Sequence, residues 1–144
     1  MYSPPYLAVG LGSCRRLSPL LLHCMCCLQN SLTGTIAQSL AVGDGMMGSA
    51  KLAILNLAGN ELNGAIPEFH APSLTTVNVS GNQLTGQLLL EFHALSDETI
   101  PSRLVSVDVS NNLLTGINSQ DYDGVGSILS YLDASHNQIL VCGG

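Results

Sequence analysis

The sequence has no tryptophan, and aromatic residues make up only 4% of its 144 positions. Charge is scarce as well, because charged residues account for 10% and the net charge is −6, with four basic side chains against ten acidic ones. Nucleic acids and anionic membrane surfaces select clustered Lys and Arg, so neither is an expected partner. Apolar residues still make up 46% of the chain, which excludes intrinsic disorder and predicts one domain with an aliphatic core.

Long hydrophobic runs are missing too. A membrane-spanning helix needs about 18 or more consecutive apolar residues, so we expect no membrane insertion by this chain itself. The apolar stretch at residues 17–28 follows Arg15 and Arg16, in the order of a secretory signal, but no small-residue cleavage pattern follows it. We therefore expect residues 1–21 to be a disordered or weakly signal-like N-terminal segment.

The five cysteines are unevenly placed, with four of them within residues 14–27. These four are too close together to indicate a disulfide framework, and no second ligand pair follows at the spacing of a zinc site. Residues 121–124 resemble part of a calcium loop but lack its later Glu. We therefore expect neither a metal nor a cofactor, and interpret Cys27 as a small apolar core residue.

An internal repeat dominates the rest of the chain. The eleven-residue block reads LAILNLAGNEL at 52–62, LTTVNVSGNQL at 74–84, LVSVDVSNNLL at 104–114 and LSYLDASHNQI at 129–139. A degenerate copy precedes these four and starts near Leu22. Every apolar position and every block Asn coincides in the alignment, while the length between blocks varies.

After each of the first four blocks comes a second pattern, of the form Leu-x-Gly-x-Ile, at residues 32–36, 62–66, 84–88 and, shortened, 114–117. Together the two patterns resemble the plant-specific subclass of the leucine-rich repeat family, although only the second copy keeps the following proline. The resemblance covers residues 22–142, with blocks starting near 22, 52, 74, 104 and 129. It implies an α/β solenoid, a right-handed superhelix of about five short repeats with few or no regular α-helices. A parallel β-sheet is expected on the concave face, with loops, turns or brief 3₁₀ pieces on the other.

The physics of the block agrees with this architecture. The short apolar alternation is typical of a strand whose paired apolar residues, such as Leu55 and Leu57, point inward. One turn cannot bury its own leucines, so neighbouring turns must stack. The block Asn follows the strand where the chain turns, and its amide is expected to bind otherwise unpaired backbone groups. This predicts a structural Asn ladder of Asn30, Asn60, Asn82, Asn112 and Asn137.

The residues between the inward positions should face outward on the concave side, where proteins of this family bind their partners. The residues expected to bind a partner there are Asn56, Asn78, Ser106, Asp108, Tyr131, Asp133 and His136. The resemblance implies a non-enzymatic module that recognises a protein or peptide, as part of a receptor-like protein at the cell surface or outside the cell. Asn78 also begins an Asn-Val-Ser sequon and is a glycosylation candidate in a secreted protein.

Other interpretations remain open at this stage. Secreted enzyme inhibitors and purely structural solenoids carry the same repeat block. An enzyme is disfavoured, because Ser110 and Ser135 lie in a repeat column of small polar residues rather than beside a sheltered base. A metal bridged by Asp108, Asp133 and His136 is also disfavoured. Stacked repeats expose an apolar cross-section unless a cap covers it, so we expect the isolated chain to be marginally stable or to self-associate.

Overall fold

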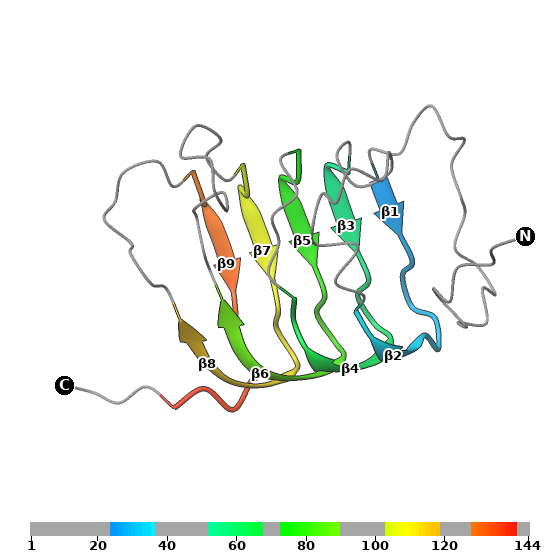
Figure 1. The fold of residues 1–144 in the computed structure, drawn as a ribbon, viewed down its shortest axis with the longest axis vertical. Coiled ribbons are helices and arrows are strands. Elements are labelled where there is room, and N and C mark those ends of the chain that lie inside the picture. The colour runs from blue at the N-terminus through cyan, green and yellow to red at the C-terminus, as the bar shows by residue number, and fades with distance from the viewer. Residues whose placement is uncertain (1–23, 37–51, 68–72, 90–102, 119–127, 141–144) are drawn as a thin grey trace, which may run out of the picture.

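The first sheet of the protein, sheet A, contains one short strand from each of five turns. The computed structural model describes residues 24–36, 52–67, 73–89, 103–118 and 128–140. In spatial order the strands are β1 (Cys24–Cys26), β3 (Ile54–Asn56), β5 (Thr76–Asn78), β7 (Ser106–Asp108) and β9 (Tyr131–Asp133), all parallel (Figure 1). The segment 1–21 and the calcium-like residues 121–124 lie outside the described residues.

The pairing register of sheet A matches the sequence alignment residue for residue. Leu55 pairs with Val77, Val77 with Val107, and Val107 with Leu132. At the other end Met25 pairs with Leu55, so the degenerate first copy occupies its own place in the sheet. The strand-forming block therefore predicted the order and the register of sheet A.

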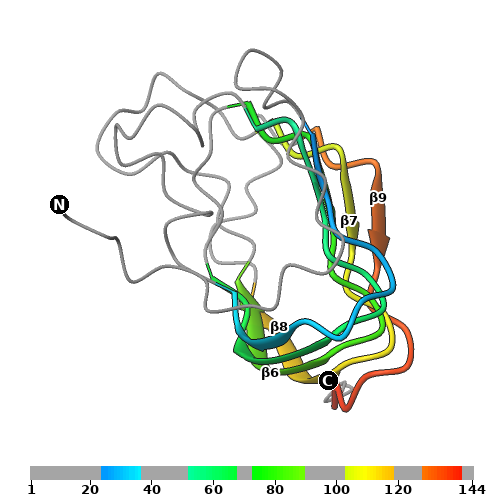
Figure 2. The ribbon, with the colours of Figure 1, turned by 90° about the vertical axis from the view of Figure 1, so that its right-hand side faces the viewer.

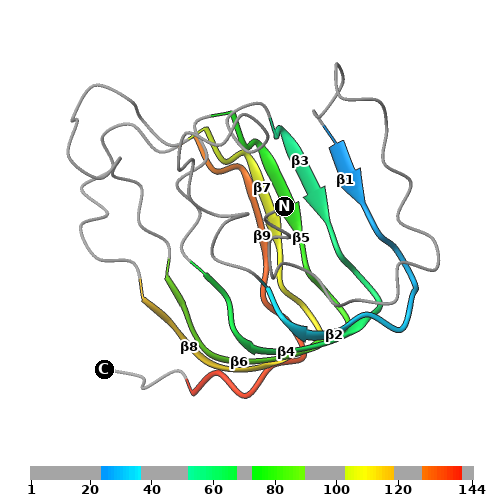
Figure 3. The same ribbon diagram turned by 45° about the vertical axis from the view of Figure 1, so that its right-hand side comes forward.

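A second parallel sheet, sheet B, was not predicted. It is built from the Leu-x-Gly-x-Ile segments, where loops, turns or 3₁₀ pieces were expected. Its strands are β2 (Thr33–Thr35), β4 (Glu61–Ala65), β6 (Gln83–Leu89) and β8 (Leu113–Asn118), in that order. No helix occurs in the described ranges. Sheets A and B form adjoining walls of one coil (Figures 2 and 3).

Glycine allows the chain to bend within sheet B. Gly64 has a φ of 78°, and a Cβ added to it would lie 2.9 Å from Cγ2 of Thr35 in the preceding turn. Gly34 and Gly86 also have positive φ. Gly116 does not, and the register between β6 and β8 shifts at Gly86/Gln87, where Thr115 of β8 has no counterpart in β6. The regular pairing of sheet B thus changes in the fourth copy, the one whose pattern is shortened.

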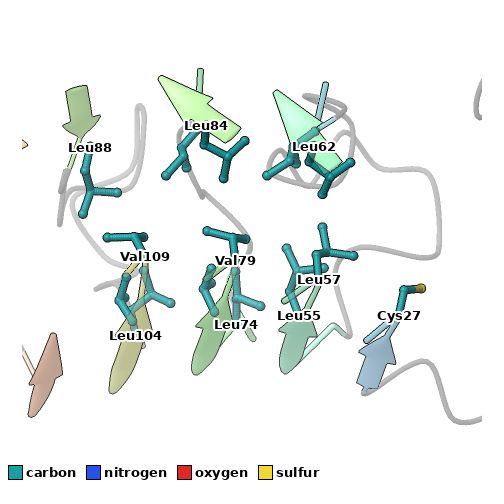
Figure 4. Packing of buried hydrophobic residues seen from close by; sticks show 14 of the residues in the cluster. Cys27, Leu55, Leu57, Leu62, Leu74, Val79, Leu84, Leu88, Leu104 and Val109 are labelled. Carbon is teal, nitrogen blue, oxygen red and sulfur yellow. The ribbon is translucent and has the colours of Figure 1, made fainter. Parts of the chain in front are cut away.

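The core lies between the two sheets. Leu55, Val79 and Val109 from the side of sheet A face Leu62 and Leu84 from sheet B (Figure 4), and no core side chain is more than 7% exposed. Among the described residues, no helix has the length and apolarity needed to cross a membrane. These leucines and valines provide the aliphatic core that the sequence predicted.

The interpretation of Cys27 as no more than a core residue was wrong. Its side chain is buried at the end of the core, as expected, but it is disulfide-bonded, and its partner lies outside the described side chains. An inward thiol can be reached by a cysteine distant in sequence, which spacing alone does not reveal. The thiol of Cys26, by contrast, is exposed, as strand alternation predicts.

Candidate functional site

The open face of sheet A consists of the side chains that point away from the core, on the side predicted to be concave. The strand register aligns Asn56, Asn78, Asp108 and Asp133 in one row. The neighbouring row contains Ile54, Thr76, Ser106 and Tyr131. Six of the seven residues expected to bind a partner therefore lie in two adjacent rows, and all six are at least partly exposed.

The first of these rows has a structural role that the sequence interpretation missed. Oδ1 of Asn78 accepts hydrogen bonds from the backbone N–H of Ser80 at 3.0 Å and from its hydroxyl at 2.7 Å. Asp108 binds Ser110 with the same two distances. Asn56 and Asp133 likewise accept the N–H two residues later. We call this the Asx-turn row, because each side chain closes a local turn at the end of its strand.

Tyr131 and Asp133 form the acidic end of the open face. Tyr131 is 50% exposed, and its hydroxyl lies 3.5 Å from Oδ2 of Asp133. The pKa of Asp133 is lowered, chiefly by the backbone N–H of Ser135 and then by the Ser135 hydroxyl. The pKa of Tyr131 is raised above 10.0, first by the charge of Asp133 and then by desolvation and by Asp108. At neutral pH this end therefore presents a carboxylate beside a neutral phenol.

His136, the seventh predicted residue, follows the strand rather than lying in it. Its φ is 54°, and Gln29, Gly59, Gly81 and Asn111 have positive φ at the equivalent positions of the other turns. This left-handed conformation favours Gly and Asn, and His is also enriched there among non-glycine residues. The left-handed backbone conformation therefore accounts for the residue types at this position of the repeat. The side chain of His136 is exposed and lies beside the acidic end.

The predicted ladder residues join successive turns from inside the coil. Oδ1 of Asn112 accepts the N–H of Leu84 in the preceding turn at 3.0 Å. Its Nδ2 donates to Val79 O in that turn at 3.0 Å and to Val109 O in its own turn at 3.1 Å. Asn60, Asn82 and Asn137 make the same pattern. Each of these amides thus acts as both donor and acceptor between two turns.

Asn30 differs from the other four ladder residues. Its Nδ2 donates to Leu28 O at 3.0 Å within its own turn, and it binds no other turn among the described residues. Each ladder Asn reaches toward the turn before it, and no described turn precedes the first one. Its position in the repeat is the same, but its hydrogen bonding is not.

The glycosylation candidate lies near the centre of the open face. Asn78 is on β5, the middle strand of sheet A, and its oxygen is held by Ser80 of the same sequon. Among the described residues its Nδ2, the atom that would carry a glycan, makes no hydrogen bond. A glycan there would project over the row that contains Asn56 and Asp108.

The geometry does not resemble a nucleophilic site at the candidate serines. Ser110 is buried, and its hydroxyl donates to Asp108 as part of the turn. No group of three or more His, Cys, Asp or Glu side chains that could hold a metal occurs in the described ranges. The open face instead offers rows of hydrogen-bonding groups, one phenol and two carboxylates.

Two parallel sheets with an Asn ladder between successive turns define a repeat solenoid, and the profile of the Leucine Rich Repeat family matches residues 73–95. The chain has the fold of a leucine-rich repeat solenoid, and its repeats are similar to those of plant leucine-rich repeat receptors. Over 67 residues it is 36% identical to receptor-like protein 7 of Arabidopsis thaliana, which covers 45% of this chain and 6% of that protein.

Solved structures of plant receptors have the same fold. The ectodomain of the receptor kinase GASSHO1/SCHENGEN3 from Arabidopsis thaliana, in complex with CASPARIAN STRIP INTEGRITY FACTOR 2, has 25% identity and a TM-score of 0.60 over 80% of this chain and 12% of its own. The plant peptide hormone receptor RGFR1, in complex with RGF2, has 29% identity and a TM-score of 0.54 over 76% of this chain and 16% of its own. The chain therefore spans a small fraction of these relatives' length.

Proposed function

We propose that the chain is a recognition module of a receptor-like protein, located outside the cell or at its surface, and that the open face of sheet A binds a protein or peptide. The observation that carries the proposal is the arrangement of that face. Strand register holds two rows of at least partly exposed side chains, all polar except Ile54, in line across four turns. The rows repeat at the strand spacing of about 4.8 Å and form a straight path across the strands, along which an extended peptide can lie.

The acidic end is the part of this face best suited to anchor a ligand. Tyr131 combines a large apolar surface with a hydroxyl, and exposed Tyr is enriched among residues that contribute most to binding. Asp133 is negatively charged at neutral pH, and the Ser135 N–H lowers the pKa of its carboxyl further. A ligand with a basic side chain at this position complements both groups, through the carboxylate and through the face of the phenol ring.

The test is a binding measurement after a partner has been isolated from a plant extract. Tyr131→Ala and Asp133→Ala are each expected to weaken binding, the tyrosine variant more strongly. Leu113→Ala is the matched control, because Leu113 is 41% exposed but belongs to sheet B. Unchanged affinity in both open-face variants, or an equal loss in the control, would exclude this face as the binding surface.

A further inference from the structure

The amide of Asn78 is held through its oxygen alone. Its Oδ1 accepts hydrogen bonds from the backbone N–H of Ser80 at 3.0 Å and from the Ser80 hydroxyl at 2.7 Å. Its Nδ2 makes no hydrogen bond among the described residues. The ladder residue Asn82 differs, because its Nδ2 donates to Leu57 O at 3.1 Å and to Val79 O at 3.0 Å. A new substituent on the Asn78 nitrogen therefore displaces no described hydrogen bond, whereas one on Asn82 would break the ladder.

The next strand supplies an independent comparison. Asp108 pairs with Asn78 in register, and its side chain has no nitrogen. It nevertheless accepts the Ser110 N–H at 3.0 Å and the Ser110 hydroxyl at 2.7 Å, the distances found at Asn78. The turn at this position of the repeat thus needs the side-chain oxygen and not the nitrogen. The nitrogen of Asn78 is therefore available for chemistry without loss of the turn.

The position of Asn78 decides what such chemistry would cover. Asn78 lies on β5, the middle strand of sheet A, with β3 on one side and β7 on the other (Figure 1). Its register partners are Asn56 and Asp108, and adjacent strands lie about 4.8 Å apart. All three side chains are partly exposed. A bulky group on Nδ2 therefore projects over the straight path across the strands that an extended peptide would follow.

We propose that Asn78 carries an N-linked glycan in the secreted chain, and that this glycan closes the middle of the open face to an extended ligand. Asn78 begins the Asn-Val-Ser sequon that such a modification requires. The proposal rests on the proposed function for the location of the chain and for the role of the open face. Tyr131 and Asp133 lie two strands away, at about 10 Å, and stay accessible. The glycan thus confines recognition to the acidic end.

The reaction uses only the nitrogen that the turn leaves free. Nδ2 of Asn78 attacks the anomeric carbon of the first sugar in a lipid-linked oligosaccharide pyrophosphate. The nitrogen–carbon bond forms as the bond from that carbon to the pyrophosphate oxygen breaks, one proton leaves Nδ2, and the lipid pyrophosphate departs. No oxidation or reduction occurs. The amide oxygen remains, so the product still accepts both hydrogen bonds from Ser80.

The first test is occupancy of the site. The chain is directed into the secretory pathway of cultured mammalian cells by an added signal sequence, and the mass of the secreted protein is measured before and after peptide N-glycosidase treatment. We expect an added mass that the enzyme removes and that is absent from Asn78→Asp. This variant keeps the turn acceptor, so its melting temperature should equal that of the wild type produced in bacteria without glycosylation. A secreted chain without the added mass, or a lower melting temperature of Asn78→Asp, would overturn the proposal.

The second test measures shielding of the open face with a bulky maleimide reagent. Ser106→Cys places a thiol on β7, the strand next to Asn78, and Thr85→Cys places one on the exposed side of sheet B as the matched control. With the wild-type background subtracted, the glycan should slow labelling of Ser106→Cys severalfold and leave that of Thr85→Cys unchanged. Enzymatic removal of the glycan should restore the faster rate. Equal rates with and without the glycan, or equal slowing at both positions, would overturn the proposal.

These outcomes are separate from those that test the proposed function. The added signal sequence provides the compartment, and the maleimide takes the place of the natural partner, so neither test needs the partner to bind. A partner whose affinity is insensitive to Tyr131→Ala and Asp133→Ala would refute recognition at the open face and leave the glycan assignment standing. The reverse result, an unmodified Asn78 with a sensitive partner, would overturn the glycan proposal alone.

Discussion

Two rows of short polar side chains run across the turns, and they use similar residues for different purposes. The ladder lies inside the coil, and each of its last four amides donates to carbonyl groups and accepts an N–H from another turn. The Asx-turn row lies on the open face and only accepts, from a residue two positions later. The ladder consequently needs Asn, whereas the other row works with Asn or Asp, as its sequence Asn, Asn, Asp, Asp shows.

The most disruptive test exchanges the two residue types. Asn112→Asp removes the Nδ2 donor from buried carbonyls and adds a charge at a position that is 5% exposed, so unfolding free energy should fall by about 3 kcal/mol or more. Asp108→Asn is the reciprocal control, because it keeps the acceptor and should change stability by about 0.5 kcal/mol or less. Chemical denaturation measures the unfolding free energy of both variants. Equal losses of unfolding free energy would refute the idea that the ladder needs Asn while the Asx-turn row accepts either Asn or Asp.

Removing a ladder side chain altogether should have a smaller effect. Asn112→Ala is expected to cost about 1–3 kcal/mol, since the backbone groups it binds stay buried without partners. Asn30→Ala should cost clearly less, because Asn30 makes one exposed hydrogen bond within its own turn. Thermal melts of the two variants test whether bonding between turns, rather than the residue type, determines the effect.

Sheet B offers a matched pair of glycines. Gly64→Ala forces a left-handed residue and a 2.9 Å approach to Thr35 Cγ2, so it should destabilise the protein by about 1–2 kcal/mol. Gly116→Ala has no positive φ, and its new Cβ would come no closer than 3.5 Å to Gln87. Its effect should be about 0.5 kcal/mol or less. Thermal unfolding of the two variants measures these losses. Equal losses of stability would show that the bend of β4 does not depend on glycine at position 64.

The smallest expected effect is electrostatic. Asp133→Asn keeps the turn acceptor but removes the charge that mainly raises the pKa of Tyr131, so this pKa should fall toward 10.0. Difference absorbance titration against Tyr131→Phe isolates this phenol. Because folding raises its pKa, the contribution of Tyr131 to stability is present below about pH 10 and is lost as the pH rises through the folded pKa. An unchanged Tyr131 titration in Asp133→Asn would contradict the assigned cause.

Sheet A and the place of the ladder could be predicted because the block repeats without gaps. Period-two alternation indicated the inward face of Leu55 and Leu57, and the Asn column indicated where the chain turns. Sheet B was missed because glycine within a short segment normally argues against a strand. The alternation of Leu62, Gly64 and Ile66 was the available signal for it.

The local role of the Asx-turn row was also visible in principle. Asn or Asp followed two residues later by Ser, as at Asn78 and Asp108, is typical of a side chain that closes a turn. The disulfide of Cys27 had no comparable signal, because pairing depends on proximity in space. The exposed position of Leu132 could not be predicted from its column either, since burial there depends on what lies beyond the last described turn.

The ladder has a direction. Asn60, Asn82, Asn112 and Asn137 each bind the N–H of a leucine in the turn synthesised before them. During synthesis from the N-terminus, each of these Asn residues is therefore made after the leucine N–H that it binds. The hydrogen bonds that complete one turn are thus supplied by the turn made next, so the last turn of such a stack lacks them.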